Sequence, residues 1–343
     1  MKREIVSRKD YLHGEKVETV YFGGGTPSLL TIEELNEVFT TLQGCFEIDP
    51  QAEITLEANP DTLSLEYLMG LKSLGINRLS IGIQSFFDKD LKYLSRRHNA
   101  SHALQCLDWA KDAGFENVSI DLIYGLPTSD ADQWSRNLDL FFELGIPHLS
   151  AYALTLEPNS ILTKQIEMNK VVPVNEDDAV RDYNILCQKM AQHGYLHYEI
   201  SNFCKPGMHS RHNSNYWFGI PYAGFGPAAH SYDGTSRQWN VSSIEGYVIT
   251  SLRSVTKQSI RVEQETLSPE QIYNEYVMLR LRTMWGIDLK YLKREMGERF
   301  SSHCERQAQP LLAQNHLSQT REFLYLTDEQ MLFADGIAEA LFC

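Results

Sequence analysis

Two groups of residues in this sequence carry side chains suited to binding a ligand. The members of the first group each lie at or close behind a predicted strand, where parallel α/β proteins build their sites. They are Gly24, Gly25, Thr26, Glu57, Gln84, Arg96 and Asp121. Glycines let the backbone approach a ligand, a carboxylate can bind ribose hydroxyls or an ammonium group, and arginine can bind a carboxylate bidentately. Together they suit a zwitterionic, nucleoside-like cofactor, whereas each one alone is more often a turn glycine or a helix cap.

The second group is the run HSRHNSNYW at residues 209–217. A neutral imidazole, such as that of His212, is a natural axial ligand for haem iron. Tyr216 and Trp217 offer flat apolar faces that could stack on a porphyrin. The alternative is an ordinary loop, in which Asn213 and Ser214 form turns and the aromatic rings pack on the protein. The residues alone favour this alternative.

Alternating strands and helices must position the first group. Strands are predicted at residues 17–22, 53–57, 78–83, 118–123 and 148–154. The helices between them are predicted at residues 32–42, 64–74, 88–94, 101–113 and 131–144, and a further helix covers residues 1 to about 12. This alternation indicates an α/β fold with parallel pairing and right-handed crossovers. A curled barrel fits it better than a flat sheet.

The pattern changes beyond residue 158. We expect a connection at 159–175, a helix at 176–193, loops rich in Gly, Asn, His and aromatic residues at 195–240, and mainly helices from about 245. The clearest late elements are helices at 269–284 and 289–296 and a hairpin at 317–326. The sequence therefore predicts three parts. They are residues 1–158, a partial barrel; residues 159–243, a connection and loop-rich haem or substrate region; and residues 244–343, a helical, winged-helix-like domain.

Composition limits the class of protein. The 343 residues include 45 acidic and 31 basic side chains, and the net charge of −14 disfavours binding to nucleic acid. No apolar run reaches the roughly 20 residues that a transmembrane helix needs, and no signal peptide is recognised. We therefore expect a cytoplasmic protein, for which peripheral membrane contact stays open. Six widely spaced cysteines indicate buried free thiols and no CxxC-type metal site.

Five stretches of the sequence resemble the oxygen-independent coproporphyrinogen III oxidase family of radical S-adenosylmethionine (SAM) proteins. They are YFGGGTPSLL (21–30), LEANPDTL (56–63), RLSIGIQSF (78–86), SIDLIYGLP (119–127) and HLSAYALTLEP (148–158). They occur in the family's order and spacing, and the resemblance covers essentially the whole chain. The run HNSNYW (212–217) is similar to the HNxxYW element that marks the haem chaperone branch of this family, HemW, and that the oxidases lack.

The resemblance implies a partial (β/α)6-type radical SAM barrel and assigns roles to both groups of residues. For SAM, it implies contacts from Gly24, Gly25 and Thr26 to the methionine moiety, from Glu57, Gln84, Arg96 and Asp121 to the amino acid and ribose, and from the Ala153 backbone. For haem, it favours His212 as the iron ligand, with Asn213, Tyr216 and Trp217 beside it. The implied function is delivery of haem to haem-receiving proteins. The alternative is oxidative decarboxylation in porphyrin biosynthesis by an oxygen-independent coproporphyrinogen III oxidase.

The sequence departs from the family at its beginning. Members of the family start with a strand and a CxxxCxxC loop, whose thiolates hold a [4Fe-4S] cluster. This sequence starts inside the first βα unit, and none of its six cysteines has that spacing. We therefore expect the first strand and the cluster to be absent, SAM binding to be weak or lost, and radical catalysis to fail. A non-functional fragment is a third hypothesis. The sequence indicates neither the recipient protein, nor the second axial ligand, nor the oligomeric state.

Overall fold

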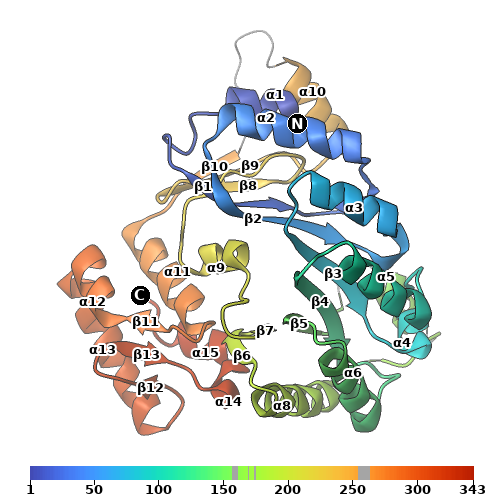
Figure 1. Ribbon diagram of the computed structural model, residues 1–343. Helices are drawn as coiled ribbons and strands as arrows, with labels where there is room; N and C mark the ends of the chain where they lie inside the picture. The colour runs from blue at the N-terminus through green and yellow to red at the C-terminus, as the bar shows by residue number, and fades with distance from the viewer. Residues whose placement is uncertain (157–160, 169, 174, 254–262) are drawn as a thin grey trace. The chain divides into compact units, whose positions relative to one another are not determined.

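The computed structural model describes residues 1–156, 161–168, 170–173, 175–253 and 263–343 (Figure 1). These residues form one seven-stranded sheet and two three-stranded sheets, with helices between the strands. The predicted boundary between residues 158 and 159 lies outside the described residues. Within the described ranges, no helix has both the length and the apolar character needed to cross a membrane.

The seven-stranded sheet contains all five predicted strands in chain order. Its strands are β1 (Val17–Phe22), β2 (Ile48–Ala58), β3 (Arg78–Gln84), β4 (Asn117–Tyr124), β5 (His148–Ala153), β6 (Leu196–Glu199) and β7 (Asn202–Cys204), in the order β1-β2-β3-β4-β5-β7-β6. Strands β2 to β5 pair in parallel, which confirms the predicted βα pattern. The short strands β6 and β7 pair antiparallel beyond β5, where the sequence predicted loops.

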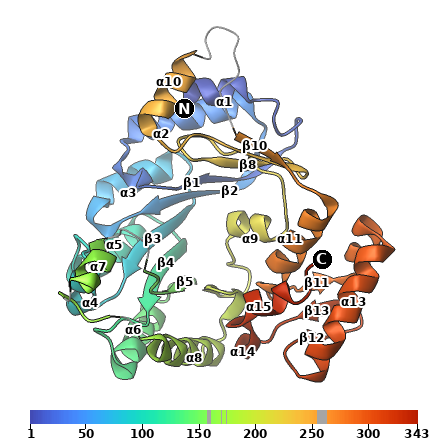
Figure 2. The ribbon, with the colours of Figure 1, turned by 180° about the vertical axis from the view of Figure 1, so that it is seen from behind.

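Helices follow the parallel strands as predicted. They are α2 (Ile32–Cys45), α3 (Leu65–Ser73), α4 (Asp88–Tyr93), α5 (Ala100–Asp112), α6 (Ala131–Glu143) and α8 (Glu176–Gln192), and one further helix, α7 (Ile161–Glu167), lies where the sequence predicted a connection. Four of these helices begin at a side chain that accepts a backbone hydrogen bond, namely Ser64, Asn99, Asp130 and Asn175. Helices α6 and α8 lie side by side in both views (Figures 1 and 2). Leu79, Ile81 and Leu122 are buried in the core of the sheet.

Helices and two small sheets make up the rest of the described chain. The helices are α1 (Lys2–Ser7), α9 (Arg211–Trp217), α10 (Ile244–Arg253), α11 (Pro269–Leu281), α12 (Leu289–Tyr291), the π-helical turn η4 (Leu292–Met296), α13 (Glu298–Ala313), α14 (Asp328–Met331) and α15 (Ala334–Glu339). The sheets are β8 (His230–Tyr232), β9 (Ser236–Trp239) and β10 (Glu263–Thr266), and β11 (Ile287–Asp288), β12 (Ser318–Gln319) and β13 (Phe323–Tyr325). Strands β12 and β13 confirm the predicted hairpin.

Two predicted elements were wrong in part. The first helix ends at Ser7, because residues 8–14 form turns in which His13 and Gly14 have φ values of 53° and 82°. The run that begins at Arg211 is a helix, α9, although Asn and Ser usually disfavour helix interiors.

The chain divides into two compact units, each assembled from separate segments. The barrel unit contains residues 20–32 and 53–210, and the α9 unit contains residues 1–19, 33–52 and 211–343. Strands β1 and β2 contribute residues to both units. The residues predicted to bind SAM all lie in the barrel unit, and those predicted to bind haem all lie in the α9 unit. The three-part division at residues 158 and 243 stays a prediction.

Candidate functional sites

The glycine loop behind β1 is fixed by Glu57 of the neighbouring strand β2. The Tyr21 hydroxyl donates to Glu57 Oε1 at 2.7 Å, and the Gly24 backbone N–H donates to Oε2 at 3.1 Å. Gly24 and Gly25 have φ values of 74° and 65°, a region that favours glycine. A Cβ on either residue would meet no atom within 4 Å. The backbone of this loop is therefore open to a ligand on the side that a side chain would occupy.

Arg96 and Gln84 lie together at the end of β3. Arg96 Nη2 donates to Asn59 Oδ1 at 2.6 Å, and Asn59 Nδ2 donates to Thr26 Oγ1 at 3.4 Å. A Cβ on Gly82 would lie 2.8 Å from Gln84 Nε2, so glycine makes room for the Gln84 side chain. Gln84 itself has a φ of 69°, at an irregularity in the β3–β4 pairing. A non-glycine residue in this conformation stores strain of the kind found at binding sites.

Asp121 lies inside β4, opposite Ser150 of β5. Burial, together with the nearby charge of Glu57, raises the pKa of Asp121 to about 7, although a hydrogen bond to Ser150 opposes the shift. Both the neutral and the charged form of this carboxyl group are therefore populated near neutral pH. Ala153 is the last residue of β5 and is exposed. The structure thus places the predicted SAM residues on, or in the segments that follow, successive strands of one sheet.

The residues predicted to bind SAM are here called the strand-end cluster, and their donors and acceptors fit SAM. Two carboxyl groups, an amide, a guanidinium and open glycine backbone match an ammonium group, a carboxylate and ribose hydroxyls. Asn59 belongs to the cluster, but it was not predicted from the sequence. Its position could have indicated it, because it lies two residues after Glu57 in the same strand-end run, LEAN.

The described residues do not fit an iron–sulfur cluster. Among them, no group of three or more His, Cys, Asp or Glu side chains is placed to hold a metal ion. All six cysteines are free; Cys106, Cys204 and Cys304 are buried, as predicted, but Cys45 and Cys187 are half-buried and Cys343 is exposed at the chain end. The absence of a cluster from this protein stays a prediction.

His212 and Tyr216 face each other one turn apart on α9. His212 Nε2 and the Tyr216 hydroxyl are 3.0 Å apart, and the two rings meet edge to face with centroids 5.1 Å apart. On the other side of the imidazole, His212 Nδ1 lies 2.8 Å from Thr19 Oγ1. Burial lowers the pKa of His212 to about 4, so its ring is neutral at physiological pH. Such a ring, oriented by a second hydrogen bond, is suited to binding a metal ion.

Trp217 and Phe218 make contacts of a different kind. The Arg282 guanidinium lies over the Trp217 ring at 5.7 Å, and the Phe218 and Trp285 rings are 4.8 Å apart. Residue 217 is rotated by about 100° around the helix from Tyr216. The structure therefore brings His212 and Tyr216 together and places Trp217 against the residue that follows α11. Asn213 lies next to His212 in the first turn of α9.

The sequence missed Thr19 and Phe218 at this site. Thr19 is 193 residues from His212 in the chain, so no local pattern could connect them. Phe218 had a signal, because it extends the aromatic pair at 216–217 to three consecutive rings. Its side chain is 44% exposed and that of Tyr216 is 40% exposed, which leaves apolar area open at the end of α9.

Comparisons with known proteins connect the chain to described families. Residues 2–151 match the Radical SAM superfamily, and residues 267–333 match the HemN C-terminal domain. Heme chaperone HemW of Mycobacterium tuberculosis H37Rv is 33% identical over 341 residues, which cover 99% of this chain and 85% of the relative. Heme chaperone HemW of Lactococcus lactis is 31% identical over 325 residues, which cover 95% of this chain and 84% of the relative.

A solved structure shows the same fold. Coproporphyrinogen III oxidase (HemN) from Escherichia coli, a radical SAM enzyme, superposes with a TM-score of 0.81 over 99% of this chain and 81% of that chain. The sequences are 22% identical, so this likeness speaks for the fold alone. It confirms the partial radical SAM barrel that the sequence predicted.

Proposed function

Since the chain belongs to the HemW haem chaperone family of radical SAM proteins, we propose that it binds haem and passes it to haem-receiving proteins in the cytoplasm. One observation supports this most: a neutral histidine, His212, lies beside exposed aromatic area on α9. The coproporphyrinogen III oxidase is less favoured, because the oxidase matches at 22% identity while the chaperones match at 31% and 33%.

In this proposal His212 Nε2 binds the haem iron. Thr19 Oγ1 accepts a hydrogen bond from Nδ1–H, and this tautomer leaves the lone pair on Nε2. The Tyr216 hydroxyl lies 3.0 Å from Nε2 and would have to turn away for the iron to reach this nitrogen. Asn213, Tyr216 and Trp217 border the porphyrin, and Tyr216 supplies apolar area for it.

The strand-end cluster is proposed to hold SAM. Gly24, Gly25 and Thr26 contact its methionine moiety through the open loop backbone. The amino acid and ribose groups are bound by four side chains and one backbone position, namely Glu57, Gln84, Arg96, Asp121 and Ala153.

A hemin titration of the full chain, followed at the Soret band, tests the haem proposal. We expect saturation near one equivalent, and we expect His212→Ala to weaken binding by about tenfold or more because it removes the iron ligand. The matched control is His316→Ala, which removes an exposed histidine of the same unit and should leave binding unchanged. Binding that does not saturate, or that both variants leave unaltered, would count against the proposal.

A further inference from the structure

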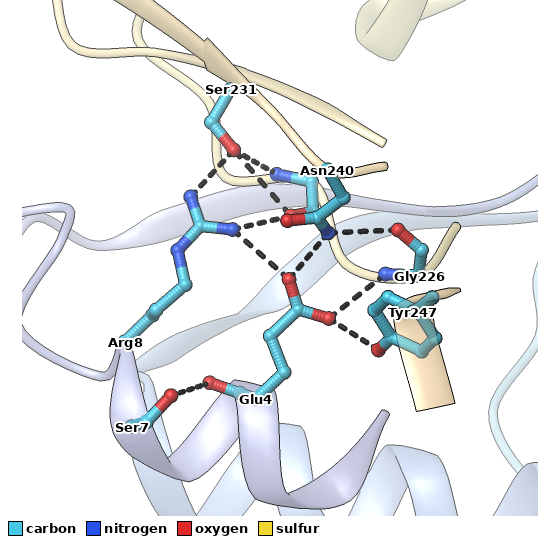
Figure 3. Close-up of polar contacts among 8 residues, drawn as sticks. Glu4, Ser7, Arg8, Gly226, Ser231, Asn240 and Tyr247 are labelled. Carbon is cyan, nitrogen blue, oxygen red and sulfur yellow. Dashed lines mark hydrogen bonds and ion pairs between the residues drawn. The ribbon is translucent and has the colours of Figure 1, made fainter. Parts of the chain in front are cut away.

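The glycine-containing run at residues 222–231, here called the GFG loop, is anchored to the first helix of the chain. Figure 3 shows the Glu4 side chain of α1 at the centre of this anchor. Glu4 Oε2 accepts from the Gly226 N–H at 3.0 Å and from the Tyr247 hydroxyl at 2.5 Å. Glu4 Oε1 accepts from Asn240 Nδ2 at 2.6 Å and from Arg8 Nη1 at 3.2 Å. The carboxylate is wholly buried, so these four donors replace water.

Arg8 holds the other half of the same loop (Figure 3). Its Nη1 donates to the Gly224 carbonyl at 2.9 Å, and its Nη2 donates to Ser231 Oγ at 2.7 Å. The loop fits this anchor only with glycines at two positions. Gly226 has a φ of 114°, and a Cβ on Gly224 would collide with the backbone carbonyl of His230. The hydrogen bonds from Glu4 and Arg8, together with the two glycines, hold the loop backbone more firmly than an exposed turn requires.

Tyr222, the first residue of the GFG loop, contacts Tyr216, the neighbour of the proposed haem ligand. Tyr222 exchanges two backbone hydrogen bonds of 2.9 Å with Tyr232, which continues the anchor into β8. The Tyr222 ring meets the Tyr216 ring edge to face, with centroids 4.8 Å apart. Tyr216 in turn contacts His212 through its hydroxyl and its ring. Contacts thus run without a break from Glu4 to the imidazole, all within the α9 unit.

We propose that Tyr222 is a positioning residue for haem binding, and that Glu4 and Arg8 set its place by anchoring the GFG loop. This inference rests on the proposed function of His212. The Tyr222 ring limits how far Tyr216 can turn, and Tyr216 determines when Nε2 of His212 is open to the iron. The first helix therefore supports the proposed haem site through the GFG loop, Tyr222 and Tyr216.

Variants of Tyr222 test this directly by hemin titration of the full chain. Tyr222→Leu removes the ring contact, and we expect about threefold to tenfold weaker binding with an altered Soret band. Tyr222→Phe keeps the ring and should stay within about twofold of the wild type, with the same spectrum. A purely structural role for Tyr222 would change the melting temperature but not the spectrum of bound haem.

Glu4→Gln tests the anchor, because it keeps the size of the side chain but loses the charge that holds Arg8. We expect weaker hemin binding and the same spectral change as in Tyr222→Leu. Glu37→Gln is the matched control. Glu37 lies on α2 and forms an exposed ion pair with Lys2, which is on α1 like Glu4. Should Glu4→Gln fail to fold, the two Tyr222 variants decide the question.

The outcomes separate this inference from the proposed function. If His212→Ala weakens binding while Tyr222→Leu matches the wild type in affinity and spectrum, the positioning role is refuted and the haem function stands. If His212→Ala has no effect, the proposed function itself fails.

Discussion

At the scale of single residues, burial sets the charge of both proposed sites. It lowers the pKa of His212 to about 4 and raises the pKa of Asp121 to about 7. Both shifts favour the neutral form, as expected when a titratable group leaves water. For His212 this gives an imidazole that can bind iron throughout the physiological range. For Asp121 it gives a carboxyl group that can donate as well as accept a hydrogen bond.

The pKa of His212 predicts how haem binding depends on pH. Protons compete with iron for the imidazole only near or below its folded pKa of about 4, whereas an ordinary histidine titrates near 6.5. We therefore expect the His212-dependent part of hemin binding to be constant from pH 8 to about 5.5. The stability that His212 contributes follows the same sign: it is present above pH 6.5 and is lost as the pH falls toward 4.

Hemin titrations at several pH values, with His212→Ala as the reference, check this expectation. A half-loss of the His212-dependent binding near pH 6.5 would show an ordinary, solvated imidazole. It would contradict the desolvation that lowers the pKa of His212.

At the scale of elements, strands and helices with a regular apolar period could be predicted from the sequence, whereas elements that depart from such a period could not. Strands β1 to β5 and helix α11 were predicted because apolar residues repeat in them with a strand or helix period. Helix α9 was missed because Asn and Ser side chains, which occur at residues 213–215, can bond to the nearby backbone and so generally favour turns. The strand-end residues Glu57 and Gln84 were recognised from topology alone, because parallel strands end on one side of a sheet.

The backbone of the loop after β1 gives a prediction at this scale. Gly24→Ala places a side chain at a φ of 74°, so we expect it to lower the free energy of unfolding by about 1 kcal/mol. Gly44→Ala is the matched control in helix α2, where a Cβ meets no atom within 4 Å. It should raise the free energy of unfolding by about 0.5 kcal/mol, because alanine favours the helix. Urea unfolding of both variants makes the comparison, and a neutral Gly24→Ala would show that the loop does not need glycine.

At the scale of the whole molecule, the proposed haem site depends on segments that are distant in the chain. Glu4 and Thr19 belong to the same compact unit as His212, although 193 residues of sequence separate Thr19 from His212. Contacts of this kind leave no mark in composition or periodicity. The HNSNYW run could therefore single out His212 and Tyr216 as candidate site residues, but the sequence could not identify Thr19 and Glu4, which position them in the proposed site.

Chemical rescue shows whether His212 of the full chain binds haem iron. The measurement is the electron paramagnetic resonance spectrum of ferric haem bound to the wild type and to His212→Gly, with and without free imidazole. We expect a histidine-ligated spectrum for the wild type, its loss in His212→Gly, and its return when imidazole enters the vacated position. A wild-type spectrum without a histidine ligand, or a His212→Gly spectrum identical to the wild type, would show that His212 does not bind the iron.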